Sequence, residues 1–157
     1  MPTNLYGPGD NYHSTNSHVL PALIRCFHEA KTNKLQSVCC WGSGNPRREF
    51  LHVDDLGNAV VHALQYWQPG IADLQHLNVG TGIDISIKEL AHLAAEVVGF
   101  NGQIEWDRSK PDGTPQKLLD VSRINNIGWQ AKISIDQGLS STYLNFKEEI
   151  TSETIRY

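Results

Sequence analysis

The sequence predicts an α/β fold with mostly parallel strands and covering helices, on three observations. The apolar run His76–Val79 ends at Gly80-Thr-Gly82 before a helical pattern, which is the order of a strand-to-helix crossover. The strand-like run Glu49–Val53 likewise passes directly into a helical pattern. At 157 residues the chain is also long enough for one domain with its own apolar core.

The first segment, Met1–Asn11, is expected to be the end of a strand that runs into a Gly-Pro-Gly-Asp-Asn turn. A polar loop follows, and a helical pattern then extends to about Asn33 with its apolar residues on one face. Pro21 suits the first turn of this helix, where its missing N–H costs little. His18 lies just before or at the helix start, and the residues alone favour a capping or surface histidine over a catalytic one.

The stretch Trp41–Asp55 is the part around which the rest of the chain is expected to fold. Two glycines, Asn45 and Pro46 predict a turn, because glycine tolerates positive φ and proline lacks a donor. This turn joins two expected strands, Val38–Trp41 and Glu49–Val53.

Asp54 and Asp55 are expected to cap and begin the next helix, whose apolar residues recur every three or four positions. Just before it, one indole, Trp41, and two guanidiniums, Arg47 and Arg48, lie on one short connection. They suit a base and a phosphate, since arginine presents a planar fork to phosphate oxygens. The alternative is a core tryptophan with two solvated arginines, and spacing alone favours that alternative.

The two remaining long helices carry clear start signals. Ser86 and Glu89 are spaced as a capping box before an apolar face, and Gly99 is the expected stop. Ser134 and Gln137 repeat the same spacing at the start of the last helix.

The segments between these helices are shorter. Gln103–Asp107 is an expected strand, and Arg108–Lys117 contains two prolines and is expected to be a surface loop. Asp120–Gly128 is expected to form a short helix that ends in glycine, and Tyr66–Gln75 a loop. Residues 151–157 show no pattern and are expected to fray, so that 1–150 form a single unit.

Composition narrows the class of protein. Lys and Arg number 13 against 17 Asp and Glu, a formal net charge of -4, which argues against a general nucleic-acid binder. No apolar run is long enough to predict a membrane span. The three cysteines, with Cys39 and Cys40 adjacent, suit reduced thiols in a cytoplasmic protein. There are seven histidines but no Cys-x-x-Cys or His-x-x-x-His pair, so no metal is expected.

One string makes the central stretch more specific. Trp41-Gly-Ser-Gly-Asn-Pro-Arg-Arg-Glu-Phe-Leu-His-Val-Asp-Asp55 resembles the nucleotide-sugar branch of the extended short-chain dehydrogenase/reductase superfamily. Three further strings narrow the resemblance to the GDP-L-fucose synthases: Pro2-Thr-Asn-Leu-Tyr-Gly-Pro8, Asn78-Val-Gly-Thr-Gly82 and Ser109-Lys-Pro-Asp-Gly-Thr-Pro115. These enzymes epimerise and then reduce a GDP-keto-deoxy-mannose with NADPH. The resemblance implies the carboxyl-terminal part of a Rossmann-type parallel sheet plus a small α/β substrate-binding domain.

The resemblance also implies roles for individual residues. His18 would be the acid/base of the epimerisation and would lie near the NADP cofactor. The other cofactor contacts would be Pro2, Thr3, Asn4 and Leu5. The GDP-sugar substrate would be bound by Trp41, Arg48, Asp112 and Arg25.

In the family, the string at Pro2–Pro8 follows a Gly-rich dinucleotide loop and a Tyr-x-x-x-Lys pair, and we expect neither in this chain. Its G-x-G strings lack the remaining glycine of a dinucleotide fingerprint. NADP would therefore be bound mainly by an absent amino-terminal half, the chain alone would be inactive, and the complete enzyme would be a homodimer. Cys26 and Gln116 replace two arginines typical of the family, which would remove positive charge near the substrate.

Three functions remain open from the sequence. The first is the substrate-binding half of a GDP-L-fucose synthase. The second is a nucleotide-sugar-binding module without catalysis, because hydride transfer needs a bound cofactor. The third is another NAD(P)-dependent sugar-nucleotide epimerase or dehydratase. The strings Lys110-Pro-Asp-Gly-Thr-Pro115 and Asn16-Ser-His18 favour the first.

Overall fold

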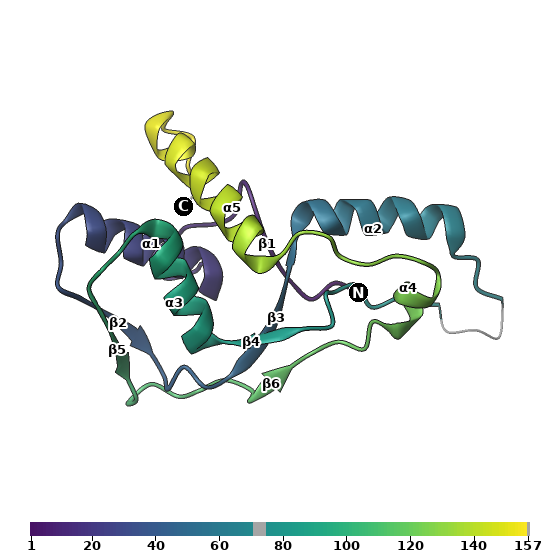
Figure 1. Cartoon of the computed structure of the whole chain (residues 1–157), viewed down its shortest axis with the longest axis horizontal. Helices are drawn as coiled ribbons and strands as arrows, with labels where there is room; N and C mark the ends of the chain where they lie inside the picture. The colour runs from purple at the N-terminus through teal and green to yellow at the C-terminus, as the bar shows by residue number, and fades with distance from the viewer. Residues whose placement is uncertain (71–74, 157) are drawn as a thin grey trace.

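A computed structural model describes residues 1–70 and 75–156 and shows helices packed against two small sheets (Figure 1). Helices and strands are interspersed along the chain and parallel strand pairs are present, so the predicted α/β class is confirmed. In chain order the elements are β1 (Asn4–Tyr6), α1 (Val19–Thr32), β2 (Ser37–Trp41), β3 (Arg47–His52), α2 (Val53–Tyr66), β4 (Asp84–Ser86), α3 (Ile87–Val98), β5 (Gln103–Asp107), β6 (Gln116–Lys117), α4 (Ser122–Asn126) and α5 (Ile135–Thr151).

Strand β3 is the centre of the larger sheet. It pairs in parallel with β1 and with β6, and antiparallel with β4. Strands β2 and β5 form a separate parallel pair. Parallel pairing therefore predominates, as predicted. Strand β4 runs the other way because the chain reverses just before it, where Gly82 adopts a φ of +74°.

The expected strand His76–Val79 is wrong as a full strand. Val79 makes one isolated parallel bridge to Pro2, in which the Thr3 N–H donates to the Val79 carbonyl at 3.0 Å. Leu77 and Val79 are nevertheless buried, as their apolar character predicts. The segment lies beside the first three residues of the chain and finds too few pairing positions there to form a ladder.

The capping boxes are confirmed at both predicted positions. In α3 the Ser86 side chain accepts from the Glu89 N–H, and the Glu89 side chain accepts from the Ser86 N–H. Ser134 and Gln137 form the same reciprocal pair at the start of α5. Gly99 ends α3 in the left-handed conformation, with a φ of +77°. These termini were predictable because all their partners lie within three residues.

The predicted cap of α2 is wrong by two residues. Strand β3 ends at His52, and this buried histidine is the N-cap, whose ring accepts a hydrogen bond from the Asp54 N–H at 3.2 Å. Asp55 is also buried, and its Oδ2 accepts from the N–H groups of Lys132 and Ile133 at 3.0 and 2.9 Å. Asp55 thus fixes the loop that leads into α5.

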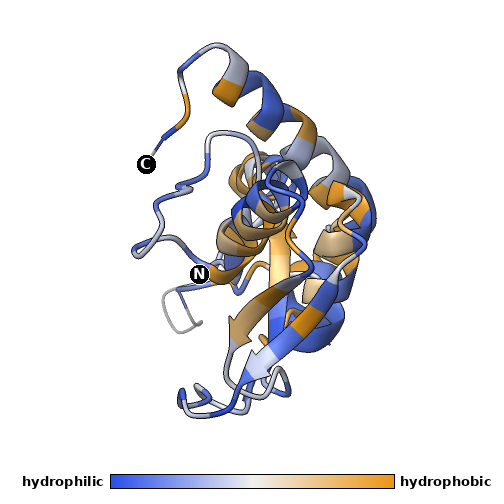
Figure 2. Ribbon diagram, turned by 90° about the vertical axis from the view of Figure 1, so that its left-hand side faces the viewer, coloured by the Kyte–Doolittle hydropathy of each residue, from blue (hydrophilic) through white to orange (hydrophobic). Residues whose placement is uncertain are grey.

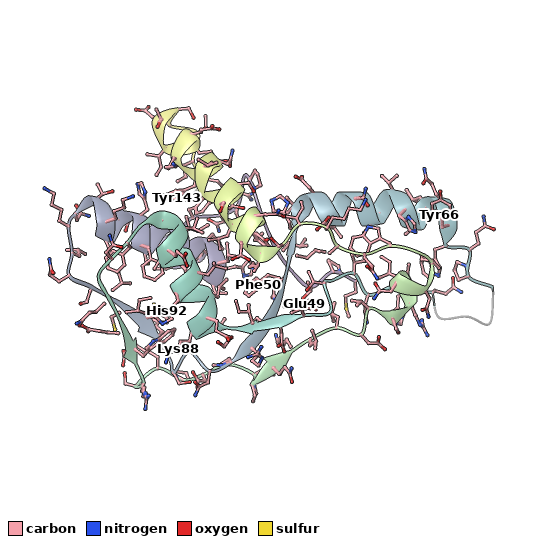
Figure 3. The ribbon with its side chains drawn as sticks, in the orientation of Figure 1. Glu49, Phe50, Tyr66, Lys88, His92 and Tyr143 are labelled. Carbon is pink, nitrogen blue, oxygen red and sulfur yellow. The ribbon has the colours of Figure 1, made fainter. Side chains whose placement is uncertain are left out.

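Helix α2 buries only part of its apolar surface. Ala59 is fully buried, whereas Val61 is 54% exposed and Leu64 is 82% exposed. Tyr66, at the end of the helix, is also exposed (Figure 3). The apolar periodicity predicted the helix correctly, but one side of it faces outward.

The core is divided into two clusters by β3. Phe50 belongs to the cluster under α1, α3 and α5, and Leu51 belongs to the cluster under α2 and α4. Successive side chains of a strand point to opposite faces, so one strand supplies both clusters. Figure 2 shows apolar and polar bands side by side along the strands and helices, as expected for elements with one face towards the core.

Helix α5 extends through Thr151, the first residue of the segment expected to fray. Beyond it, Ile155 packs against the larger cluster, and the Tyr12 N–H donates to the Arg156 carbonyl at 2.9 Å. This segment is therefore attached to the loop before α1 up to residue 156. In the expected loop Tyr66–Gln75, residues 71–74 lie outside the described part of the chain.

Candidate functional site

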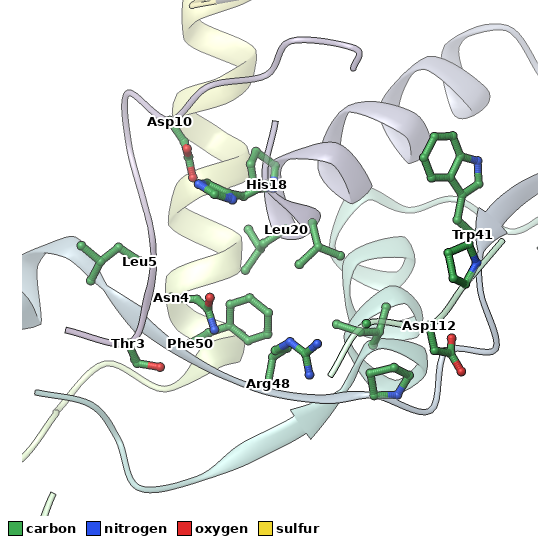
Figure 4. A pocket seen from close by; sticks show the side chains of 17 residues that line it. Thr3, Asn4, Leu5, Asp10, His18, Leu20, Trp41, Arg48, Phe50 and Asp112 are labelled. Atoms are coloured by element: carbon green, nitrogen blue, oxygen red, sulfur yellow. The ribbon is translucent and has the colours of Figure 1, made fainter. Parts of the chain in front are cut away.

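A cavity of about 610 Å³ lies between β1, the start of α1, β3 and the 111–113 loop (Figure 4). Its walls bring together residues from strings that are far apart in the sequence. The predicted site residues that line it are Thr3, Asn4, Leu5, His18, Trp41, Arg48 and Asp112. Spacing in the sequence could not show that these residues meet in one cavity.

These side chains are arranged along the cavity in a definite order. In Figure 4, His18 lies at one end beside Asp10, and Trp41 and Asp112 lie at the other end. The guanidinium of Arg48 lies between the two ends. The cavity therefore has an imidazole, then a cation, then an exposed aromatic ring with a carboxylate.

His18 is the N-cap residue of α1 by position, but its side chain makes no capping hydrogen bond. Of the expected capping or surface role, capping by the side chain is therefore wrong, whereas the surface position agrees with the structure, and the imidazole lines the cavity. The residue is exposed, and the rigid first turn of α1 holds its backbone.

Arg48 and Arg47 are neighbours on β3, but their side chains contact different groups. Arg48 lines the cavity, and its Nη1 donates to the Arg47 carbonyl at 2.7 Å. A Cβ on Gly113 would lie 3.1 Å from the Arg48 Nη2, so the 111–113 loop closes tightly against this guanidinium. Arg47 instead pairs with Asp84 at 2.7 Å and with Glu89 at 3.5 Å. Of the two expected guanidiniums, Arg48 is the one that faces the cavity.

The carboxylate of Asp112 is fixed by Ser43. It accepts from the Ser43 N–H at 2.8 Å and from the Ser43 hydroxyl at 2.6 Å. The hydrogen bond from the Ser43 hydroxyl, and to a smaller extent that from the Ser43 N–H, lowers the pKa of Asp112 and favours its charged form. A Cβ on Gly42 would lie 2.5 Å from the Asp112 Oδ1, so a glycine is needed beside it.

Trp41 is not a core residue, because it is 75% exposed at the end of β2. The Nζ of Lys110 lies 5.5 Å from the centre of its ring, within the range of a cation–π contact. An open aromatic face beside a fixed carboxylate is suited to stacking and to accepting hydrogen bonds from a base.

Two predicted site residues do not line the cavity. Pro2 is outside the cavity wall and makes an isolated bridge to Val79. The guanidinium of Arg25 donates to Glu29 at 2.6 Å and to the Tyr12 carbonyl at 2.8 Å, which turns it towards the loop before α1.

Gln116, expected to leave a gap in positive charge near the nucleotide, also lies elsewhere. Its side chain donates to Asp84, the same carboxylate that pairs with Arg47. An arginine at position 116 would therefore face Asp84 in this structure. Glutamine in place of arginine therefore lowers the positive charge around Asp84 and not in the cavity, because Gln116 does not line the cavity.

Glu49 is a site residue that the sequence reasoning missed. Its side chain is fully buried on β3, next to Phe50 (Figure 3), and accepts from the Gly82 N–H at 2.7 Å and the Leu119 N–H at 3.1 Å. Its carbonyl accepts from the side chains of Thr3 and Asn4 at 3.2 and 2.8 Å. Glu49 therefore holds the Thr3–Asn4 wall of the cavity to β3. A glutamate directly before the apolar pair Phe50-Leu51 of an expected strand was the available signal.

Asp10 was also missed, although it lines the cavity beside His18. It lies in the Gly-Pro-Gly-Asp turn, which the sequence reasoning treated only as a turn. A carboxylate directly after the two glycines of this turn was the available signal in the sequence.

The expectation that the chain contains no Tyr-x-x-x-Lys pair is wrong as a statement about spacing. Tyr143 and Lys147 have this spacing on α5. Tyr143 is buried, its hydroxyl contacts the His28 Nδ1 at 3.0 Å, and Lys147 lies over its ring at 4.9 Å. Neither residue lines the cavity, so this pair is a packing feature of α5.

Within residues 1–70 and 75–156, no group of three or more His, Cys, Asp or Glu side chains could hold a metal ion. The helices of the same residues are too short or too polar for any of them to cross a membrane.

Comparisons with known proteins agree with this architecture. The NAD dependent epimerase/dehydratase family model matches residues 1–80. GDP-L-fucose synthase 1 of Arabidopsis thaliana is 56% identical over 91% of this chain and 43% of its own length. GDP-L-fucose synthase of Escherichia coli strain K12 is 54% identical over 94% of this chain and 48% of its own length.

A crystal structure of a GDP-L-fucose synthetase from Naegleria fowleri bound to NADP has a TM-score of 0.86 to this chain. It is 26% identical and covers 99% of this chain and 47% of its own. The chain spans about half the length of the curated relatives it matches. The resemblance seen in the sequence is confirmed, and the chain belongs to the NAD dependent epimerase/dehydratase family.

Proposed function

We propose that this chain is the substrate-binding half of a GDP-L-fucose synthase, which epimerises and reduces GDP-4-keto-6-deoxy-D-mannose with NADPH. The observation that carries the proposal is the order of His18, Arg48 and Trp41 with Asp112 along one cavity (Figure 4). A GDP-sugar has the matching order of sugar, diphosphate and base. The relatives named as GDP-L-fucose synthases, at 54–56% identity, support the identity of the nucleotide and sugar.

Each group of the cavity has a chemical task in this proposal. The Arg48 guanidinium neutralises the diphosphate, for which its planar fork is suited. Trp41 stacks on the guanine, and the charged Asp112 accepts from the guanine N–H groups. Epimerisation beside a ketone requires removal of a carbon-bound proton and return of one to the opposite face. His18 serves this step, because histidine is the usual side chain for proton transfer near neutral pH.

The residues present fit one end of NADP. Thr3, Asn4, Leu5 and His18 lie together on the cavity wall, where they would hold the nicotinamide part, and the chain has no Gly-rich dinucleotide fingerprint for the pyrophosphate. The bound cofactor supplies the hydride for the reduction. The rest of the cofactor site and its Tyr-Lys pair belong to an amino-terminal half, which together with this chain makes one complete protomer. The complete enzyme is a cytoplasmic homodimer of such protomers. The three free cysteines suit that compartment.

The proposal is tested by calorimetric titration of GDP into the chain, alone and joined to the amino-terminal half of the E. coli relative. Arg48→Ala is expected to weaken GDP binding by about 1.5–3 kcal/mol, the range for hydrogen bonds to charged groups. Arg48→Lys should recover only part of this loss, because an ammonium cannot make the bidentate contact.

Two controls make the result specific. Guanosine lacks the diphosphate, so its binding should be the same in the parent and in Arg48→Ala. Arg123→Ala removes an exposed guanidinium from α4, outside the cavity, and should leave GDP binding unchanged. Equal GDP affinity in Arg48→Ala and the parent would overturn the assignment. GDP-sugar binding without NADPH oxidation in the joined protein would instead favour a binding module.

A further inference from the structure

We propose that Asp10 is a positioning residue for His18, whose ring N–H donates to the Asp10 Oδ2 when the cavity is filled. This inference rests on the proposed role of His18 in proton transfer. In Figure 4 the carboxylate of Asp10 and the imidazole of His18 point towards each other at the same end of the cavity.

The carboxylate of Asp10 has one oxygen in use and one without a partner. Oδ1 accepts from the Asn11 N–H at 2.7 Å. Oδ2 is buried and has no hydrogen-bond partner among the described residues. A buried carboxylate oxygen without a donor is costly, so a donor that comes within reach is strongly favoured. The facing side chain that lines the same cavity end is His18.

The backbone on both sides of Asp10 is held in place. The Gly9 N–H donates to the Asn145 Oδ1 on α5 at 3.2 Å, and the Tyr12 N–H donates to the Arg156 carbonyl at 2.9 Å. His18 is equally restricted by its place at the start of α1. Both partners therefore lie on fixed backbone, so the bond would form by rotation of the side chains and not by movement of the backbone.

The charges around Asp10 suit this role. Burial raises the pKa of Asp10, and the Asn11 N–H, His18 and Arg156 lower it. Tyr12, whose hydroxyl is also buried, has its pKa raised by burial and by Asp10. The His18 side chain from the cavity and the Arg156 guanidinium from the carboxyl-terminal segment thus both lie near the carboxylate.

The consequence is a fixed orientation of the imidazole. A carboxylate that accepts from one ring nitrogen determines the tautomer, so that the second nitrogen is the one presented to the substrate. Without Asp10 the ring samples both tautomers and several orientations, and proton transfer slows. Diphosphate and base binding, at the other end of the cavity, do not depend on this pair.

The test uses Asp10→Asn, which keeps an Oδ1 acceptor for the Asn11 N–H and removes the charge. Nitrogen-15 NMR of the 157-residue chain with GDP-mannose bound, so that a sugar occupies the end of the cavity beside His18, should show one dominant His18 tautomer in the parent and a mixture in Asp10→Asn. Asp10→Glu should restore part of the preference. The control is Asp120→Asn, because the Oδ1 of Asp120 also accepts from a nearby backbone N–H, that of Ser122 at 2.9 Å, and Asp120 lies outside the cavity.

The kinetic arm uses the chain joined to the amino-terminal half of the E. coli relative, with deuterium incorporation into the keto-sugar as readout. Asp10→Asn is expected to slow exchange about 10- to 100-fold, as loss of a charged hydrogen bond does, with GDP affinity unchanged. His18→Gln should slow it about 10²–10⁴-fold.

The arms separate the two proposals. Exchange at the parent rate in His18→Gln would overturn the role of His18 and, with it, the proposed function. Loss of exchange in His18→Gln, with an unchanged tautomer and rate in Asp10→Asn, would overturn the role of Asp10 alone. In that case Asp10 would serve only to attach the segment that carries Arg156.

Discussion

At the scale of single residues, Tyr12 is fully buried, yet its hydroxyl has no hydrogen-bond partner among the described residues. A buried hydroxyl without a partner costs about 1–3 kcal/mol, and its ring already packs against Phe146 with centroids 4.5 Å apart. Tyr12→Phe keeps that packing and is expected to raise the free energy of unfolding by about 1 kcal/mol in urea titration.

The control is Tyr143→Phe, which removes a hydroxyl that does have a partner, the ring of His28 at 3.0 Å. This variant is expected to lose about 1 kcal/mol of stability, the usual net value of one hydrogen bond. A loss of stability in both variants would show that the Tyr12 hydroxyl is satisfied in solution.

Site residues taken from a sequence string were mostly predicted correctly. The prediction was wrong where the direction of a side chain depends on a partner far away in the sequence. Trp41, Arg48 and Asp112 were predicted from strings, and all line the cavity. Arg25 was predicted in the same way, but its guanidinium donates hydrogen bonds to Glu29 and to the Tyr12 carbonyl and does not line the cavity. The orientation of a long side chain depends on neighbours that the sequence does not place.

At the scale of elements, the capping box of α5 is expected to contribute measurably to the free energy of unfolding. Ser134→Ala removes the acceptor for the Gln137 N–H and should lower the free energy of unfolding by about 1 kcal/mol. Ser140→Ala, at an exposed position inside the same helix, is the matched control. It should be neutral or slightly stabilising, because alanine is the better helix former and the Ser140 hydroxyl only bonds back to the Asp136 carbonyl at 2.8 Å.

Helix ends were predictable and strand pairings were not, for a physical reason. A cap involves residues three positions apart, whereas a ladder needs a partner strand that the sequence does not identify. The antiparallel direction of β4 and the short β6 both depend on pairing with β3. The single bridge at Val79 depends on Pro2, which lies 77 residues earlier in the chain.

At the scale of the whole molecule, the cavity is assembled from segments near residues 3, 18, 48 and 112. No periodicity in the sequence joins these segments, so only the resemblance to a known family could group them in advance. Glu49 and Asp10 were missed because their importance depends on the groups brought beside them by folding. The sequence therefore predicted most of the residues that line the cavity, whereas the carboxylates that support them, Glu49 and Asp10, were found only in the structure.

The outer face of α2 is expected to affect how the whole chain behaves in solution. Single exposed apolar residues are common, but Val60, Val61 and Leu64 are 50%, 54% and 82% exposed and form one stripe at helical spacing. A contiguous exposed stripe favours association, so a second copy of the chain is expected to cover it in solution. We therefore expect the isolated chain to show concentration-dependent self-association in sedimentation velocity experiments.

The double variant Val61→Lys, Leu64→Lys tests this expectation, because lysine keeps the helix propensity and places two charges in the stripe. It should sediment as a monomer at concentrations where the parent associates. Leu144→Lys on α5 is the matched control, since Leu144 is 56% exposed but lies on another helix. Association that persists in the double variant and disappears in Leu144→Lys would place the contact on α5, because charge abolishes association only where it enters the buried surface.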